Sequence, residues 1–219
     1  KGSGGQKPQH TTRAGVVAEG GLGGGAIKIN ATESLTLDGT ISMDGTRASL
    51  PVVQYEKGGG GGAGGSVFIT TPTFSGGGTI RTNGGLSTKG QPNYPYVAVG
   101  YDGGGGGGGR IGIYCTTRQF TGLLFSKGGT LDDRFNVGTM NVEDQTINTG
   151  VEWQPIAKYS DIVGGAGTVY QNCGDNYQDY LILDNLDNRV SPFRSSPITL
   201  NGQDSLTINH VRLLNLAGA

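Results

Sequence analysis

Residues 102–115 read Asp-Gly-Gly-Gly-Gly-Gly-Gly-Gly-Arg-Ile-Gly-Ile-Tyr-Cys, which is seven consecutive glycines followed by an alternating segment. Ile111 and Ile113 share one face of that segment, whereas Gly112 and Tyr114 share the other, as in a β-strand. A glycine run alone has the composition of a flexible linker, because glycine loses more backbone entropy on ordering than any other residue. Since this run leads directly into a strand, we interpret the two together as one structural unit.

Two earlier parts of the chain repeat this pairing of a glycine run with a strand. Residues 20–25, interrupted by Leu22, precede Ala-Ile-Lys-Ile-Asn, and residues 58–65, interrupted by Ala63, precede Ser-Val-Phe-Ile-Thr. A fourth, less regular unit follows the third. The first apolar residues of the four strands lie 40, 44 and 58 residues apart, at Ile27, Val67, Ile111 and Val169. Recurrence at such intervals is typical of repeat architectures, in which length variation is confined to loops.

A second alternating run follows the first strand within a unit. Aligning the first two units by their glycines places Ile41 on Ile80. The same alignment places Leu35 on Phe74. No apolar period of 3.6 residues survives between the glycines, so no long helix is predicted.

These units predict an all-β fold, for which a right-handed parallel β-helix and an antiparallel sandwich are both open. We favour the right-handed parallel β-helix, a solenoid in which each unit is one coil, because equivalent residues recur in the same order in each unit. One domain is expected over residues 1–219, with a loop insertion at 130–160. We expect it to be a segment of a longer repeat protein or fibre.

The glycine runs have two explanations within this fold. They serve either as loops at corners that need positive φ, or as extended polyglycine II strands whose bare backbones pack against each other. Seven glycines in a row exceed what a corner needs, which favours the second explanation.

Composition and charge argue against several classes of protein. The net charge is −1, from 16 basic and 17 acidic residues, so a nucleic-acid partner is not expected. No apolar run approaches the roughly 18 residues of a membrane-spanning helix, so direct membrane insertion is not expected either. Glycine supplies 44 residues and proline 8, which together approach a low-complexity composition. Disorder is nevertheless not predicted, because the apolar residues cluster in short alternating runs.

Three glycine-rich motifs together resemble a known group of repeat proteins. They are Gly-Gly-Gly-Ala-Gly-Gly-Ser-Val-Phe-Ile at 60–69, Gly-Thr-Ile-Arg-Thr-Asn-Gly-Gly at 78–85 and Gly-Gly-Gly-Gly-Arg-Ile-Gly-Ile-Tyr at 106–114. The group comprises the glycine-rich parallel β-helix repeats of very large secreted or cell-surface proteins, especially of protists, with plant and bacterial relatives. The resemblance implies an extracellular, non-enzymatic protein with structural or adhesive roles in a surface layer, appendage or fibre. It brings no catalytic residues to this chain.

No catalytic residue, cofactor or metal site is predicted. A carbohydrate-active β-helix, either a polysaccharide lyase or a hydrolase, is an alternative, since cleavage of a glycosidic bond uses two carboxylates flanking it. The acidic residues available for that role all lie in the insertion: Asp132, Asp133, Glu143, Asp144 and Glu152. A zinc site is not expected, because His10 and His210 have no second histidine or cysteine at ligand spacing. A phage-type adhesin built on packed polyglycine strands is a further alternative.

Two kinds of surface site are expected. Asn30 begins the only Asn-x-Ser/Thr sequon, which predicts N-glycosylation in a secreted eukaryotic protein. Tyr94, Tyr96 and Tyr101 cluster in a proline-containing stretch, and Trp153 is the only tryptophan. All four are candidates for partner binding, and the tyrosines also for glycan stacking, but anchoring of the loop is the role that we favour for the tyrosines. The expected partners are more of the same chain, identical copies in a fibre or layer, and glycans.

Cys115 and Cys173 are predicted to form a disulfide. Each lies four residues after the first apolar residue of its strand, so the third and fourth units place both at one position of adjacent coils. Their α-carbons would then stack about 5 Å apart, which a disulfide tolerates. The alternative is a pair of buried free thiols, and an extracellular location favours the bridge.

Overall fold

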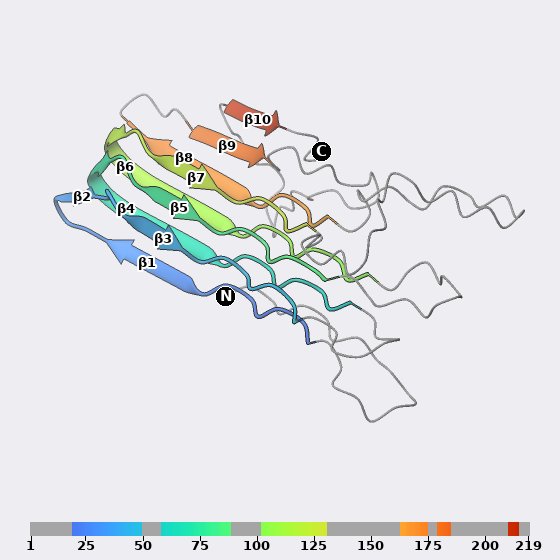
Figure 1. Ribbon diagram of the computed structural model, residues 1–219. Coiled ribbons are helices and arrows are strands. Elements are labelled where there is room, and N and C mark those ends of the chain that lie inside the picture. The colour runs from blue at the N-terminus through green and yellow to red at the C-terminus, as the bar shows by residue number, and fades with distance from the viewer. Residues whose placement is uncertain are drawn as a thin grey trace, which may run out of the picture.

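The computed structural model describes residues 19–49, 58–88, 102–130, 163–174, 179–184 and 210–214, and within these ranges it consists of strands and extended segments (Figure 1). The strands are β1 (Ala26–Asn30), β2 (Ser34–Thr36), β3 (Thr40–Ser42), β4 (Ser66–Gly76), β5 (Thr79–Arg81), β6 (Arg110–Phe120), β7 (Leu123–Phe125), β8 (Thr168–Cys173), β9 (Asp179–Asp184) and β10 (His210–Leu214).

The described strands form two sheets. Sheet A has seven strands in the order β1-β4-β6-β8-β9-β10, with β2 also paired to β4, and sheet B has three in the order β3-β5-β7. Every pair is parallel except β8 and β9, which run antiparallel. Figure 1 shows β1, β4, β6 and β8 side by side, so that segments far apart in the sequence become neighbours.

The strand register predicted from the repeats is confirmed in sheet A. Ile27, Val67, Ile111 and Val169 occupy one position in four consecutive strands. The second strand of the unit also aligns as predicted, since Ile41 pairs with Ile80 and Leu35 with Phe74. Apolar residues at one ladder position stack across the strands, so each parallel pair adds to a continuous core.

The core lies between sheet A and sheet B. Ile69 and Ile113 face it from sheet A and Ile80 from sheet B, and each is at most 1% exposed. Phe74 and Phe120 stack with their ring centroids 4.4 Å apart. Gly76 follows at the end of β4 with a φ of 108°, a left-handed conformation that glycine adopts without steric cost, and the chain then enters sheet B.

The predicted right-handed parallel β-helix is wrong. Coils of such a solenoid would continue in one direction, but β9 runs antiparallel to β8. Sheet B also stops at β7, so β8 has no counterpart there in the part of the chain that the structure describes. The described residues therefore form one mixed and one parallel sheet, and no closed solenoid is seen among them.

The regular stacking of units ends at β8. This strand has 6 residues, whereas β4 and β6 each have 11 and reach the bend that leads to sheet B. Gly174, with a φ of 112°, directly follows Cys173, and its N–H still donates to the carbonyl oxygen of Cys115 in β6. The next described strand, β9, pairs with the other side of β8 in the antiparallel direction.

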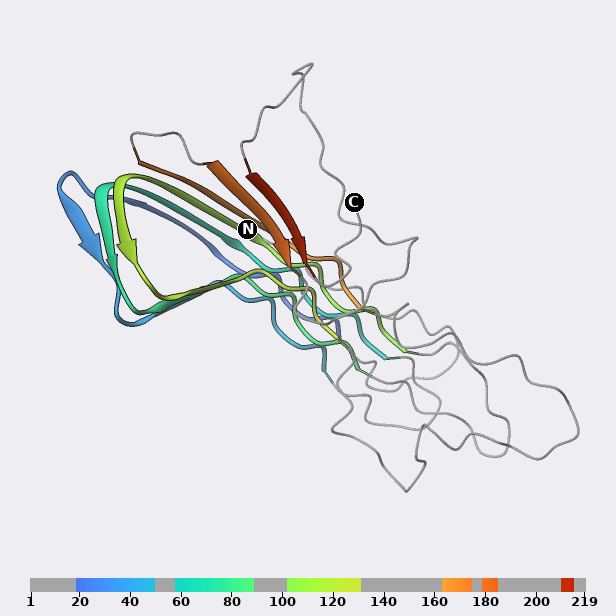
Figure 2. The same ribbon diagram turned by 90° about the horizontal axis from the view of Figure 1, so that it is seen from above.

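The glycine runs lie outside the sheets as a bundle of extended segments. Seen from above in Figure 2, each of the first three units runs along sheet A, bends into sheet B and returns beside the glycine run from which it started. The backbones bond at every third residue: the N–H groups of Gly103, Gly106 and Gly109 donate to the carbonyl oxygens of Thr88, Gly85 and Thr82 at 3.0, 3.0 and 2.7 Å. Three residues per turn is the period of the polyproline II helix, which has no internal hydrogen bonds and so offers its backbone groups to neighbours.

Each glycine segment contacts several others through bare backbone. Gly106 donates to Gly85 and accepts a hydrogen bond from the N–H of Gly129. A Cβ atom at Gly106 would come well under 3.0 Å from the carbonyl of Gly62, whereas at the next residue, Gly107, the nearest atom would be 4.0 Å away. The close packing therefore excludes side chains at particular positions of the run and tolerates them at others.

Candidate binding face

The outward side of sheet A carries a different set of side chains from the core side. Because side chains alternate along a strand, the residues between the core positions point outward. Lys28, Phe68, Gly112 and Tyr170 share one ladder position across β1, β4, β6 and β8. Tyr114 lies in the next outward row, which also contains Asn30, Thr70 and Asn172.

Three aromatic rings meet on this side, and we call Phe68, Tyr114 and Tyr170 the aromatic stripe. The ring centroids of Phe68 and Tyr114 are 5.1 Å apart, and those of Tyr114 and Tyr170 are 5.6 Å apart. The rings tilt by 39° and 55° to each other. Phe68 and Tyr114 are each 37% exposed, so a row of ring surface crosses β4, β6 and β8 in contact with solvent.

Gly112 makes room for this arrangement. It occupies the ladder position between Phe68 and Tyr170, and a Cβ there would lie 3.3 Å from Cδ2 of Phe68 and 3.7 Å from Cε2 of Tyr114. Because Gly112 has no side chain, the rings of Phe68 and Tyr114 lie over the backbone of β6 at this position. This cover is also structural, since an aromatic neighbour compensates for glycine within a strand.

Positive charge accompanies the stripe. The Nζ atom of Lys28 lies 5.6 Å from the ring centroid of Phe68, a cation–π contact. Arg110 is exposed at the outward start of β6, one row from Gly112. The exposed residues of β1, β4, β6 and β8 include these two cations, Arg118 toward the end of β6, and no acidic residue; in the next strand, Asp179 pairs with Asn172.

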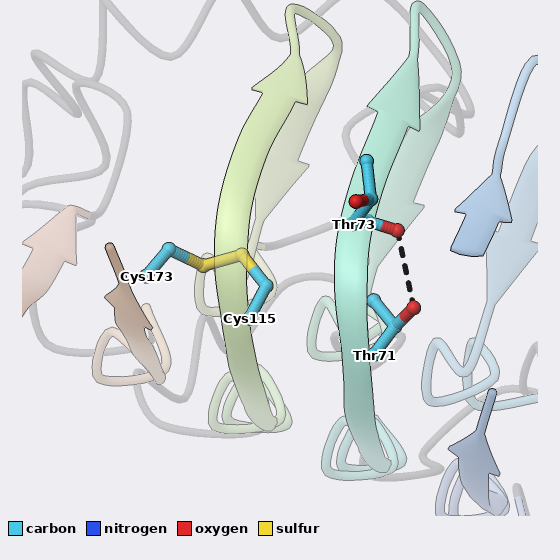
Figure 3. Close-up of a disulfide and its surroundings, with 4 residues drawn as sticks. All are labelled: Thr71, Thr73, Cys115 and Cys173. Carbon is cyan, nitrogen blue, oxygen red and sulfur yellow. Dashed lines mark hydrogen bonds between the residues drawn. A yellow bond between two sulfur atoms is a disulfide. The ribbon is translucent and has the colours of Figure 1, made fainter. Parts of the chain in front are cut away.

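The disulfide lies on the core side of sheet A (Figure 3). Cys115 and Cys173 are bonded, and their α-carbons are 4.4 Å apart. They occupy one position of β6 and β8, and Thr71 holds the same position in β4. The buried hydroxyl of Thr71 donates to the carbonyl oxygen of Thr73 at 3.1 Å, which satisfies a polar group at the edge of the core.

Acidic residues of the first unit bond to the backbone of the second. Oδ1 of Asp44 accepts a hydrogen bond from the N–H of Asn83 at 2.7 Å, and Oδ1 of Asp38 accepts one from the N–H of Gly77 at 3.0 Å. Oδ2 of Asp44 also pairs with Nε of Arg81 at 2.8 Å. These carboxylates therefore join neighbouring units. Within the described residues, no group of three or more histidine, cysteine or acidic side chains is placed to hold a metal ion.

The other predicted site residues have different outcomes. Asn30 is exposed at the end of β1, in a position that an oligosaccharide can reach. Tyr94, Tyr96, Tyr101 and Trp153 lie outside the described residues. So do most of the insertion at 130–160 and the carboxylates that an enzyme would use, Asp132, Asp133, Glu143, Asp144 and Glu152.

The aromatic stripe was missed by the sequence reasoning, although a signal for it existed. The alignment that places Val67, Ile111 and Val169 together also places Phe68 and Tyr170 at one outward position. Tyr94, Tyr96 and Tyr101, by contrast, are close to one another in sequence. Residues that are adjacent in a parallel sheet come from different units, so the register has to be applied before aromatic residues are counted.

Comparison with protein-family models, curated proteins and solved structures gives no match to this chain. Among the described residues, no helix is long and apolar enough to span a membrane.

Proposed function

We propose that this chain is a non-enzymatic structural and adhesive module of an extracellular layer, appendage or fibre. The observation that carries the proposal is that, among the described strands, the first unit forms one edge of both sheets. β1 ends sheet A and β3 ends sheet B, and no described strand pairs with their outer sides. Edge strands with free backbone groups are templates for pairing with another chain.

The side chains of this unit support the same conclusion. Ile27 and Ile41 are half-buried, whereas the residues at their ladder positions in the second unit, Val67 and Ile80, are 2% and 0% exposed. A further unit stacked on the first would bury Ile27 and Ile41 to the same extent. Burial of that apolar surface would favour addition of another copy, at roughly 25 cal/mol per Å².

The disulfide and the hydrogen-bonded glycine segments suit an extracellular part that is under mechanical force. Disulfides persist in oxidising compartments and are rare in the reducing cytosol. The hydrogen bonds between the glycine segments connect units that are distant in sequence, so a pulling force is shared among many backbone bonds.

The test is self-association of the disulfide-bonded chain. We expect sedimentation velocity and multi-angle light scattering to show mass rising with protein concentration, and electron microscopy to show elongated particles that lengthen along the stacking direction. A monomer that stays monomeric over the whole concentration range would contradict the proposal.

A phage-type adhesin is a second candidate, favoured by the packing of bare glycine backbones at three-residue intervals. It shares the adhesive role but not the assembly into a layer. Detection of an N-glycan at Asn30 in protein from its natural source would exclude a phage origin, because glycosylation of this sequon occurs in the secretory pathway.

A further inference from the structure

We propose that the aromatic stripe and its two cations bind an anionic polysaccharide, with one sugar ring against each aromatic ring. This inference deepens the adhesive part of the proposed function and rests on it. The polysaccharide would run across the strands, from β4 over β6 to β8, on the outward side of sheet A.

The ring geometry fits an extended glycan. Successive ring centroids are 5.1 and 5.6 Å apart, which is close to the length of one pyranose unit in an extended chain. The face of an aromatic ring is electron-rich, so it attracts the weakly positive C–H groups on the flat side of a sugar. Successive sugars in a glycan are turned relative to one another, and the tilted rings can each face one of them.

The charges select an anionic glycan over a neutral one. Lys28 and Arg110 flank the rings, and the outward positions of β1, β4, β6 and β8 contain no acidic residue that would repel a carboxylate or sulfate. An arginine can bond a carboxylate through two parallel N–H groups, which fixes both position and orientation. Complementary charge therefore adds to the stacking.

The same charges disfavour a nucleic acid. Single strands bind grooves in which basic side chains follow a phosphate at every nucleotide. This face offers two cations along three rings, and the whole chain has a net charge of −1. A polymer with occasional anionic groups matches that density better than one with a phosphate at each unit.

Tyr114 is the residue to test, because it is the central ring of the stripe and contacts both Phe68 and Tyr170. We expect disulfide-bonded protein without an N-glycan to bind hyaluronan, which has a carboxylate on alternate sugars, or partly methyl-esterified polygalacturonate in isothermal titration calorimetry, with affinity falling as salt rises. Tyr114→Ala should weaken binding roughly tenfold. Arg110→Gln should also weaken it and flatten the salt dependence. Two matched controls should leave binding unchanged. Leu123→Ala changes an exposed leucine of sheet B, and Lys127→Gln changes a lysine outside the sheets.

Three outcomes would overturn the inference: no binding to either anionic polysaccharide, equal binding by the Tyr114→Ala protein, or tighter binding of single-stranded DNA than of either glycan. Equal affinity for a neutral glucan would overturn the choice of an anionic ligand. The same samples are measured by light scattering and circular dichroism. If the protein self-associates but does not bind glycans, this inference fails and the structural part of the proposed function remains. If it does neither, both the inference and the proposed function are contradicted.

Discussion

Cys115 and Cys173 occupy the same position of the neighbouring parallel strands β6 and β8, with α-carbons 4.4 Å apart and a disulfide between them. The two residues are separated by 58 positions in the sequence. β8 is the strand at which the parallel stacking of units ends, since β9 pairs with it in the opposite direction. The covalent bond therefore joins the last strand of the parallel series β1-β4-β6-β8 to the strand before it.

Removal of this disulfide is expected to destabilise the protein strongly. For a closed loop of this length, the chain-entropy model gives about 4 kcal/mol of stabilisation. We expect the double variant Cys115→Ser/Cys173→Ser to lose about that much free energy of unfolding in guanidinium titrations. Reductant should destabilise the natural chain and leave the double variant unaffected. Recovery of an unlinked Cys115 peptide from oxidised protein by non-reducing peptide mapping would contradict this prediction.

Two adjacent glycines should respond very differently to alanine. A Cβ at Gly106 would come well under 3.0 Å from backbone atoms of Gly62, which cannot move without breaking the hydrogen bonds of the bundle. At Gly107 the nearest atom would be 4.0 Å away. We expect Gly106→Ala to cost roughly 3 kcal/mol or more through overpacking. Gly107→Ala should lie between neutral and stabilising by up to about 1 kcal/mol, because alanine restricts the unfolded chain.

Denaturant unfolding of both proteins measures this difference. The two substitutions are chemically identical and lie in one run, so propensity effects cancel in the comparison. Equal stability of the two variants would show that the glycine segments are not packed backbone against backbone as the hydrogen bonds indicate.

The ladder positions could be predicted because the units repeat the alternation of apolar residues. Ile27, Val67, Ile111 and Val169 carry the same pattern after each glycine run, and one register buries all of them. The pairing of Cys115 with Cys173 follows from that register alone, because nothing in the sequence next to either cysteine indicates a disulfide.

The direction of β9 could not be predicted in the same way. Leu181 and Leu183 are buried and alternate, and this pattern suits a parallel coil and an antiparallel hairpin equally. Gly174, with a positive φ, directly follows β8, but Gly76 has a similar φ at the end of β4, where the chain does enter sheet B. A single glycine in a sequence with 44 of them therefore gives no distinguishable signal. The solenoid prediction failed at this point, because the apolar pattern alone does not determine the direction of the strand that follows β8.

Only part of the candidate site could be predicted from the sequence. The outward position of Tyr114 follows from the alternation around Ile113, and the structure places it there. Its contacts with Phe68 and Tyr170 join three different units. They become visible only when the register is known, and the room that Gly112 leaves for the rings requires the packed structure.

Asn30 is predicted to carry an N-glycan when the chain passes through a eukaryotic secretory pathway. The side chain is exposed at the end of β1, directly before the bend that leads to β2. We expect mass spectrometry of secreted protein to show a glycosylated Asn30 peptide, and the Thr32→Ala variant to lack it. Because the site is at the surface, the variant should keep its stability within about 0.5 kcal/mol. Fully secreted protein with unmodified Asn30 would contradict the prediction.

The last prediction concerns the outer side of β1. Gly25 accepts a hydrogen bond from Ser66 and Ala31 donates one to Thr70, so the backbone groups of odd-numbered residues point to β4. Backbone groups of the intervening residues alternate to the other side, and the N–H of Ala26 therefore points away from β4. Proline at this first position of an edge strand removes an outward donor without breaking the existing sheet.

We therefore expect Ala26→Pro to reduce self-association while the protein keeps its disulfide and its circular dichroism spectrum. Ala26→Thr retains the N–H and is the matched control, which should associate as the natural chain does. The measurement is the concentration dependence of mass in light scattering. If Ala26→Pro assembles as readily as Ala26→Thr, copies do not add by strand pairing at β1, and the contact that builds the assembly has to be sought elsewhere on the chain.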